Sequence, residues 1–208
     1  MPTTLKQFLE RLITEKAPGP SPSFSVIHAL LALTIIAEKS IGRNKLAEEL
    51  DIGEGATRTL VGRLKDAGLI ITPKVGCSLT DKGLKLWNEY QSVIKTVEIP
   101  KNELTFDGFN FAVLVKKRAH RVRSGMEQRD AAVMAGSRGA TTVLFSKGRL
   151  TFPSTNSDLA RDFPKASRQI NRLLTPDEGD AIIIVSSDNS RKAKYAALAA
   201  AWTLFEDA

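Results

Sequence analysis

The sequence predicts an α+β protein made of two compact units, a helical bundle with a β-hairpin followed by a unit of strands and helices. First, the chain has 208 residues, which is more than one typical domain and enough for two buried cores. Second, apolar residues at helical spacing fill most of the first half. Third, short apolar runs alternate with helical stretches from Phe109 onward. We therefore expect domains at 1–95 and 109–208, joined by a linker at 96–108 in which TVEIP and ELTF could pair as short strands.

The first half begins with an amphipathic helix in the segment MPTTLKQFLERLITEK, and the run APGPSPS, Ala17 to Ser23, forms a connector because proline and glycine break helices. Phe24 to Lys39 is apolar on more than one face, as expected for a helix at the centre of a bundle. A short helix at Arg43–Leu50 and a longer one at Glu54–Ala67 follow. These helices together predict a small bundle.

A β-hairpin is expected after the helix at Glu54–Ala67. Gly68 suits the position just past the end of that helix. Strands Leu69–Thr72 and Cys77–Thr80 then enclose a short tip that contains Pro73 and Gly76. Helical spacing returns at Asp81 and continues to about Ile94, with Thr80 as the N-cap.

The helix at Glu54–Ala67 has two distinct faces. Thr57, Leu60, Val61 and Leu64 stand at i, i+3, i+4 and i+7, so they predict one buried face. The other face presents arginines and small residues, with Lys65 at its edge, and can approach a DNA groove closely. Residues at the start of the preceding helix would hold phosphates, and Lys74 at the hairpin tip would reach a neighbouring backbone or minor groove. The predicted DNA-binding residues are Arg43, Asn44, Lys45, Arg58, Thr59, Gly62, Arg63 and Lys74.

With these residues in place, the segment from Phe24 to Gln91 resembles the winged helix-turn-helix regulators of bacteria and archaea. The resemblance rests on LDIGEGATRTLVGRL, DAGLI and LTDKGLKLW, in that order and spacing. It implies a recognition helix at 54–67 in the major groove and a wing at 69–80. Winged helices also serve as protein-binding or RNA-binding modules, and a helical bundle with merely solvated basic residues is the structural alternative.

The second half reads as strand, helix, two strands, helix, strand and a final helix. The expected elements are strands at Phe109–Lys116, Thr141–Phe145, Arg149–Phe152 and Ala181–Ser186, and helices at Met126–Ala135, Pro164–Leu174 and about Arg191–Phe205. This βαββαβ order plus a helix predicts a ferredoxin-like antiparallel sheet covered by helices on one face, or a related α/β sandwich.

Two groups in the second half are candidates for binding an anionic ligand. One is the basic run KKRAHRVR, and the other is SSDNS, which leaves a strand and opens the last helix. The candidate ligand-binding residues are Lys116, Arg118, Arg121, Arg123, Ser187, Asp188 and Asn189. A solvated loop and simple helix capping are the respective alternatives. The half also looks like an uncharacterised C-terminal domain fused to such helix-turn-helix units in archaeal proteins, through GMEQRDAAVMAGSRGATTVLFSKGRLTFP and AKYAALAAAW, which implies a regulatory role without a known ligand.

Composition narrows the function classes. The net charge of +7 and the pI near 9.6 suit a polyanionic partner, although the surplus is only 2 in residues 1–100 and 5 in residues 101–208. No apolar stretch is long enough for a membrane span and no secretory leader is evident, so we expect a cytoplasmic protein. The single Cys77 excludes an internal disulfide. His28 and His120 are far apart in sequence and no catalytic motif is present, so we expect no catalytic residues, no metal and no cofactor.

The sequence therefore predicts a sequence-specific DNA-binding transcription regulator whose partners are double-stranded DNA, a second copy in a homodimer and a small anionic effector. The second unit would be the effector or dimerisation module. Two alternatives remain at this point: a winged-helix interaction module of the transcription machinery, and an enzyme with its site in the second unit.

Overall fold

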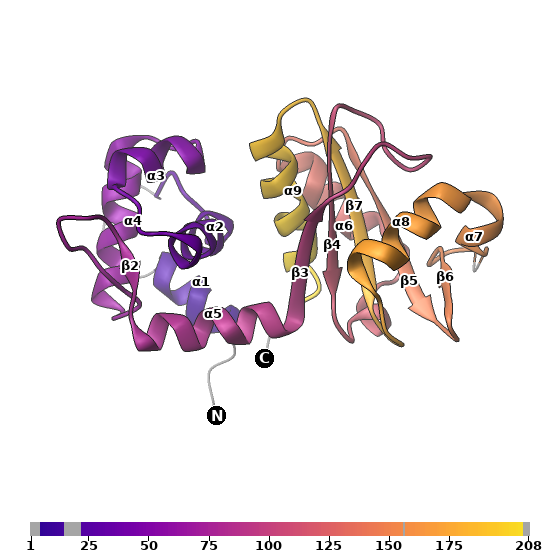
Figure 1. Ribbon diagram of the computed structural model, residues 1–208, viewed down its shortest axis with the longest axis horizontal. Coiled ribbons are helices and arrows are strands. Elements are labelled where there is room, and N and C mark those ends of the chain that lie inside the picture. Colours follow the sequence, from indigo (N-terminus) through magenta and orange to yellow (C-terminus); the bar gives the residue numbers. More distant parts are fainter. Residues whose placement is uncertain (1–4, 15–21, 156, 206–208) are drawn as a thin grey trace. The chain divides into compact units, whose positions relative to one another are not determined.

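The computed structural model describes residues 5–14, 22–155 and 157–205. The chain divides between Gln91 and Ser92 into two compact units, which are described separately below. Figure 1 shows the helices and strands of both. No helix among the described residues is both long and apolar enough to span a membrane.

The described part of the first unit contains the helices and the hairpin that the sequence predicts. The helices are α1 (Leu5–Thr14), α2 (Val26–Glu38), α3 (Arg43–Leu50), α4 (Glu54–Asp66) and α5 (Asp81–Val93), and the hairpin strands are β1 (Ile70–Ile71) and β2 (Ser78–Leu79). Most of the connector predicted at Ala17–Ser23 lies outside the described residues. Seven residues of α2 are buried, since this helix is apolar nearly all round and packs centrally.

The start of α2 is held by a reciprocal cap. The Ser25 side chain accepts the backbone N–H of Ile27, and His28 Nδ1 accepts the backbone N–H of Ser25 at 3.0 Å. Burial lowers the pKa of His28, with a smaller opposing effect from the Asp51 carboxylate. The hydrogen bond from the Ser25 N–H requires a neutral imidazole, and the lowered pKa favours that form at neutral pH. His28 therefore has a structural role here.

The hairpin is fastened to the loop before α3. The backbone N–H of Cys77 donates to the carbonyl of Ile41 at 2.7 Å, and the N–H of Ile41 donates to the carbonyl of Cys77 at 3.2 Å. Gly76 makes this approach possible: its φ is +124°, and a Cβ there would lie 2.7 Å from the carbonyl carbon of Ile41. The position of the hairpin is therefore fixed by the main chain.

The second unit is built on a five-stranded sheet in the order β3-β4-β7-β5-β6, with every neighbouring pair antiparallel. The strands are β3 (Ile94–Glu98), β4 (Phe109–Val115), β5 (Gly139–Ser146), β6 (Arg149–Thr151) and β7 (Ala181–Ser187). The helices are α6 (Met126–Met134), α7 (Leu159–Asp162), α8 (Pro164–Leu174) and α9 (Ser190–Trp202), with a 3₁₀ turn at Ala119–Arg121.

The linker expected at 96–108 needs correction, because its first residues belong to the sheet. Strand β3 begins directly after α5 and pairs with β4 along its whole length, with Val97 opposite Ala112. The remaining residues, 99–108, form a structured loop in which Ile99 and Leu104 are buried. The alternative of a short strand at TVEIP thus agrees with the structure for Thr96–Glu98, but its partner is β4 and not ELTF, which lies in the loop.

Helices cover both faces of this sheet, so the ferredoxin-like arrangement with helices on one face is wrong. α6 and α9 pack on one face, while α8 packs on the other over a core that includes Ile182 and Ile184. Figure 1 shows α9 and α8 on opposite sides of the strands. All seven residues of β7 are buried, because a central strand between two helical layers has no solvent face. The alternative in the prediction, a related α/β sandwich, agrees with this architecture.

Candidate nucleic-acid interface

Helix α4 has the buried face that its spacing predicts. Thr57, Leu60, Val61 and Leu64 are all at most 4% exposed. The hydroxyl of Thr57 donates to the carbonyl of Gly53 at 3.1 Å, so no unpaired donor is buried there. This packing fixes which side chains α4 presents to solvent.

A groove of about 510 Å³ lies in the first unit, between α4, the start of α3 and the hairpin. Helix α4 contributes Arg58, Val61, Gly62 and Lys65, which stand at i, i+3, i+4 and i+7 and therefore share one face. The other walls are Gly42 and Arg43 at the start of α3 and Thr72, Pro73, Lys74, Gly76 and Cys77 of the hairpin. Of the described residues that line the groove, four are cationic and none is acidic.

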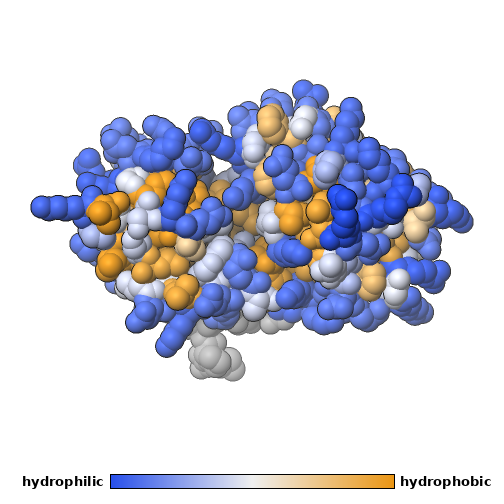
Figure 2. All heavy atoms as spheres, in the orientation of Figure 1, coloured by the Kyte–Doolittle hydropathy of each residue, from blue (hydrophilic) through white to orange (hydrophobic). Residues whose placement is uncertain are grey.

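The wall opposite α4 is apolar at its base. Cys77 is 1% exposed, and burial raises the pKa of its thiol despite the opposing charge of Arg43. The thiol is thus neutral near neutral pH and packs as a small apolar group. Elsewhere on the hairpin, Ile71 and Val75 do not line the groove and are 52% and 77% exposed. In the view of Figure 2, apolar patches interrupt the mostly hydrophilic surface of this unit.

Of the three residues predicted at the start of α3, only Arg43 lines the groove. Gly42 is the N-cap and provides no side-chain cap, so the first-turn N–H groups of α3 meet no capping side chain. Lys45 turns along its own helix, with Nζ 2.8 Å from a carboxylate oxygen of Glu48 and 3.9 Å from one of Glu49. Asn44 is exposed and does not line the groove.

The structure corrects the placement of Arg63. Its guanidinium donates to the carbonyls of Leu12 and Ile13 at the end of α1, and it lies over the ring of Phe24 at 5.4 Å. Arg63 follows Arg58 by five residues, which rotates it well away from the groove at about 100° per residue. Lys65, seven residues after Arg58 and predicted only at the edge of the exposed face, lines the groove, whereas Arg63 does not.

The remaining predicted residues of this unit differ in position. Gly62 and Lys74 line the groove as Arg58 does. Thr59 is exposed on α4 beside it, and its hydroxyl donates to the carbonyl of Gly55 at 3.1 Å. The groove thus brings together Arg43, Arg58, Gly62 and Lys74 from the prediction and adds Lys65.

The residues predicted to bind a ligand in the second unit do not form one site. Lys116 follows Val115, which pairs with Ala181 at one end of β7, whereas Ser187 at the other end pairs with Phe109. Six residues of strand separate the ends by about 20 Å. Arg118, Arg121 and Arg123 belong to the segment after Lys116, whereas Asp188 and Asn189 follow Ser187, so the two groups start from opposite ends of β7.

The second group has a capping role. The side-chain oxygen of Asn189 accepts the backbone N–H groups of Arg191 and Lys192 at 2.9 and 3.2 Å, which caps α9. Asp188 accepts a hydrogen bond from Ser187 at 3.3 Å and lies 3.9 Å from the ammonium of Lys192. The capping alternative therefore accounts for these contacts. Within the described chain, no three or more His, Cys, Asp or Glu residues gather in a way that could hold a metal ion.

Two parts of the chain match known protein families. Residues 26–85 match the PH0730-like N-terminal domain, and residues 106–204 match the domain of unknown function DUF4443. Among curated proteins, none matches the sequence.

Two solved structures are similar to different extents. The hypothetical protein PH0730 from Pyrococcus horikoshii OT3 superposes with a TM-score of 0.71 at 24% identity, over 88% of this chain and 93% of that one. ZitR of Lactococcus lactis gives a TM-score of 0.31 at 23% identity, over 38% and 56%, which is too low to compare folds. The chain thus combines a segment similar to the PH0730-like N-terminal domain with a segment similar to DUF4443, and it shares the fold of PH0730.

Proposed function

We propose that the first unit is a winged helix that binds duplex DNA through this groove, and that the protein is a sequence-specific transcription regulator. The observation that carries the proposal is the grouping of Arg43, Arg58, Lys65 and Lys74 around one groove, with no acidic residue among the lining residues that the structure describes. Three separate elements supply these cations, so their convergence depends on the fold.

The shape of the α4 surface supports the same proposal. A Cβ at Gly55 or Gly62 would meet no heavy atom within 4 Å, so the backbone of α4 is accessible on this face. The B-DNA major groove is about 12 Å wide and admits one helix. With α4 in the major groove of the DNA, Arg58 and Lys65 would face bases or phosphates. The start of α3 would contact a phosphate, and Lys74 of the wing would contact the adjacent DNA backbone or the minor groove.

The proposal gives the second unit the role of an effector or dimerisation module and assigns no catalytic activity to the chain. A two-fold dimer that binds a palindromic duplex would place two such grooves on successive turns of DNA. The alternative of an interaction module within the transcription machinery predicts that no DNA sequence is selected.

The first test is selection of genome fragments by the purified full-length protein, followed by salt titration on the selected duplex. The double variant Arg58→Ala/Lys65→Ala removes two groove cations. The matched control Lys39→Ala/Lys85→Ala removes two exposed lysines that do not line the groove.

We expect the groove variant to bind the selected duplex much more weakly and to lower the slope of log K against log salt by about two. The control should keep both the affinity and the slope close to those of the original protein. Enrichment of no sequence would favour the interaction module, and equal binding by the groove variant would place the DNA contact elsewhere.

A further inference from the structure

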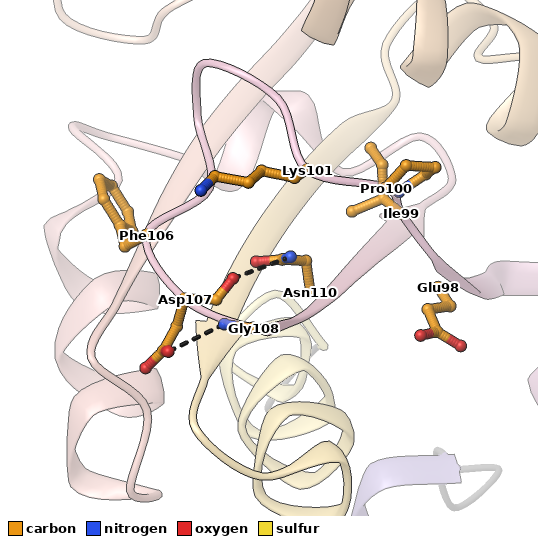
Figure 3. A pocket seen from close by; sticks show the side chains of 8 residues that line it. All are labelled: Glu98, Ile99, Pro100, Lys101, Phe106, Asp107, Gly108 and Asn110. Atoms are coloured by element: carbon orange, nitrogen blue, oxygen red, sulfur yellow. Dashed lines mark hydrogen bonds between the residues drawn. The ribbon is translucent and has the colours of Figure 1, made fainter.

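A second hollow, of about 630 Å³, lies in the second unit at the loop between β3 and β4. Every described residue that lines it comes from the single segment 98–110, as Figure 3 shows. The volume falls within the range of roughly 300 to 1,000 Å³ that is typical of small-molecule sites. The hollow shares no lining residue with the groove of the first unit, and none of the ligand-binding residues predicted from the sequence lines it.

The loop around this hollow is held by its own polar side chains. Asn102 is 7% exposed; its Oδ1 accepts the N–H of Leu104 at 2.8 Å, and its Nδ2 donates to Gln169 of α8 at 2.8 Å. The carboxylate of Glu103 accepts the N–H groups of Lys165 and Ala166 at 3.0 and 2.8 Å, so it caps α8.

The other limb of the loop is tied to the centre of the sheet. The N–H of Phe106 donates to the hydroxyl of Ser186 at 3.1 Å, and that hydroxyl donates to Asn110 Oδ1 at 2.6 Å. Ser186 and Asn110 are 0% and 4% exposed. A loop with this many fixed points presents its remaining side chains in defined places, which lowers the entropic cost of binding.

Two side chains in the hollow have no such structural role. Phe106 as a whole residue is 60% exposed. Lys101 is exposed, and its ammonium makes no ion pair or hydrogen bond with any residue that the structure describes. In Figure 3 the Lys101 side chain extends across the loop toward Phe106. A flat apolar surface and a single cation therefore face the same space.

Two acidic residues, Glu98 and Asp107, also line the hollow, but among the described residues neither forms an ion pair with Lys101. Asp107 lies 2.9 Å from Arg138 outside the hollow, and one of its carboxylate oxygens accepts the N–H of Gly108. The Glu98 side chain points away from both Lys101 and Phe106 in Figure 3. The hollow is thus suited to a molecule with one aromatic face and one negative charge.

We infer that this hollow is a binding site for a small planar aromatic anion, with the ring stacked on Phe106 and the charge paired with Lys101. The inference is independent of DNA binding by the first unit, since it concerns only residues 98–110. It places a ligand at a different site from either group predicted from the sequence.

The test measures the binding of two dyes to the full-length protein. Both dyes contain a naphthalene ring and a phenyl ring joined by an amine. 1-Anilinonaphthalene-8-sulfonate carries a negative charge, whereas N-phenyl-1-naphthylamine is neutral. Both gain fluorescence in apolar sites. The variants are Phe106→Ala and Lys101→Gln. Their matched controls are Phe109→Ala, a 41% exposed phenylalanine that does not line the hollow, and Lys147→Gln on the turn between β5 and β6.

We expect saturable binding of one sulfonate dye per chain. Phe106→Ala should weaken both dyes about fivefold. Lys101→Gln should weaken the sulfonate about threefold and leave the neutral dye unchanged. The two controls should bind as the original protein does. Unsaturable binding, or an unchanged affinity in Phe106→Ala, would overturn the site, and equal effects of Lys101→Gln on both dyes would overturn the assignment of an anion.

Discussion

Two arginines on α4, five residues apart, have different roles. Arg58 lines the basic groove, whereas Arg63 joins the end of α1 and Phe24 to α4. The sequence shows which face of α4 is buried, because that follows from apolar spacing alone. It does not show that a second helix covers Arg63, because packing between helices distant in sequence leaves no periodic signal.

Arg63→Ala should therefore act on stability. It removes hydrogen bonds from a charged group to two carbonyls and a cation–π contact, so we expect the free energy of unfolding of the first unit to fall by about 2 kcal/mol. The chain has two tryptophans, so in a Trp202→Phe background Trp87 reports urea unfolding of the first unit. Arg58→Ala is the control and should leave the stability unchanged; equal stabilities of all three proteins would contradict this role of Arg63.

His28 gives the first unit a defined response to pH. Because burial holds its folded-state pKa below the ordinary value of 6.5, the unfolded chain binds a proton more readily than the folded one. The free energy of unfolding should thus not be reduced by His28 above pH 6.5, and it should fall as the pH is lowered through that value. Urea unfolding with the same reporter, between about pH 7.5 and 5.5, measures the slope.

The matched variant for this prediction is His28→Gln. Glutamine at the third helical position can accept the same Ser25 N–H but does not titrate in this range. Its stability should be nearly constant over the window. A slope equal to that of the original protein would assign the pH dependence to other groups.

At the scale of elements, the hairpin forms one wall of the groove, and Gly76 fixes where it lies. A side chain at this position would collide with the backbone of Ile41, which cannot move without displacing the loop before α3. We expect Gly76→Ala to lower the free energy of unfolding by about 3 kcal/mol and to weaken binding of the selected duplex.

Gly68→Ala is the control for this prediction. Gly68 also has a positive φ, of +70°, but a Cβ there meets only the flexible side chain of Lys82, at 3.9 Å. It should cost about 1 kcal/mol, from backbone strain alone. Similar losses in the two variants would show that the contact with Ile41 does not position the hairpin.

The elements differ in how far the sequence predicts them. Helices such as α3 and α8 agree with their predicted bounds at Arg43–Leu50 and Pro164–Leu174, because apolar periodicity and turn residues define both ends. α7 is not predicted, and β3 is predicted only as a possible short strand at TVEIP, since four and five residues carry little periodic signal. In the groove, Arg58 and Gly62 follow from helical spacing, Arg43 from its place at the start of a helix and Lys74 from the hairpin tip, whereas Lys65 is predicted only at the edge of the exposed face.

At the scale of the whole molecule, the positive charge is not concentrated in the groove. Of the net +7, residues 101–208 carry +5, from 17 basic and 12 acidic residues. Long-range attraction to DNA therefore has a component that no groove variant removes. The order of strands is also a property of this scale: the run AIIIVSS of β7 indicates a central strand, but nothing local shows that β5 and β4 flank it.

The groove variant Arg58→Ala/Lys65→Ala, with a net charge of 7 − 2 = +5, should keep a weak affinity for any duplex at low salt. A mobility-shift titration against unrelated competitor DNA measures this, and competitor should remove the residual binding completely. Retention of sequence preference by this variant would mean that specificity comes from outside the groove.

The two backbone hydrogen bonds between Ile41 and Cys77 have a consequence for how such proteins diversify. They hold the hairpin against the loop before α3 through main-chain atoms, so the place of the hairpin does not depend on the side chains at positions 58, 65, 72 and 74. In the proposed complex with duplex DNA, exchanging these four side chains should therefore change which sequence is preferred while the hairpin keeps its place. The position of the wing and the choice of sequence would thus depend on different atoms of this scaffold.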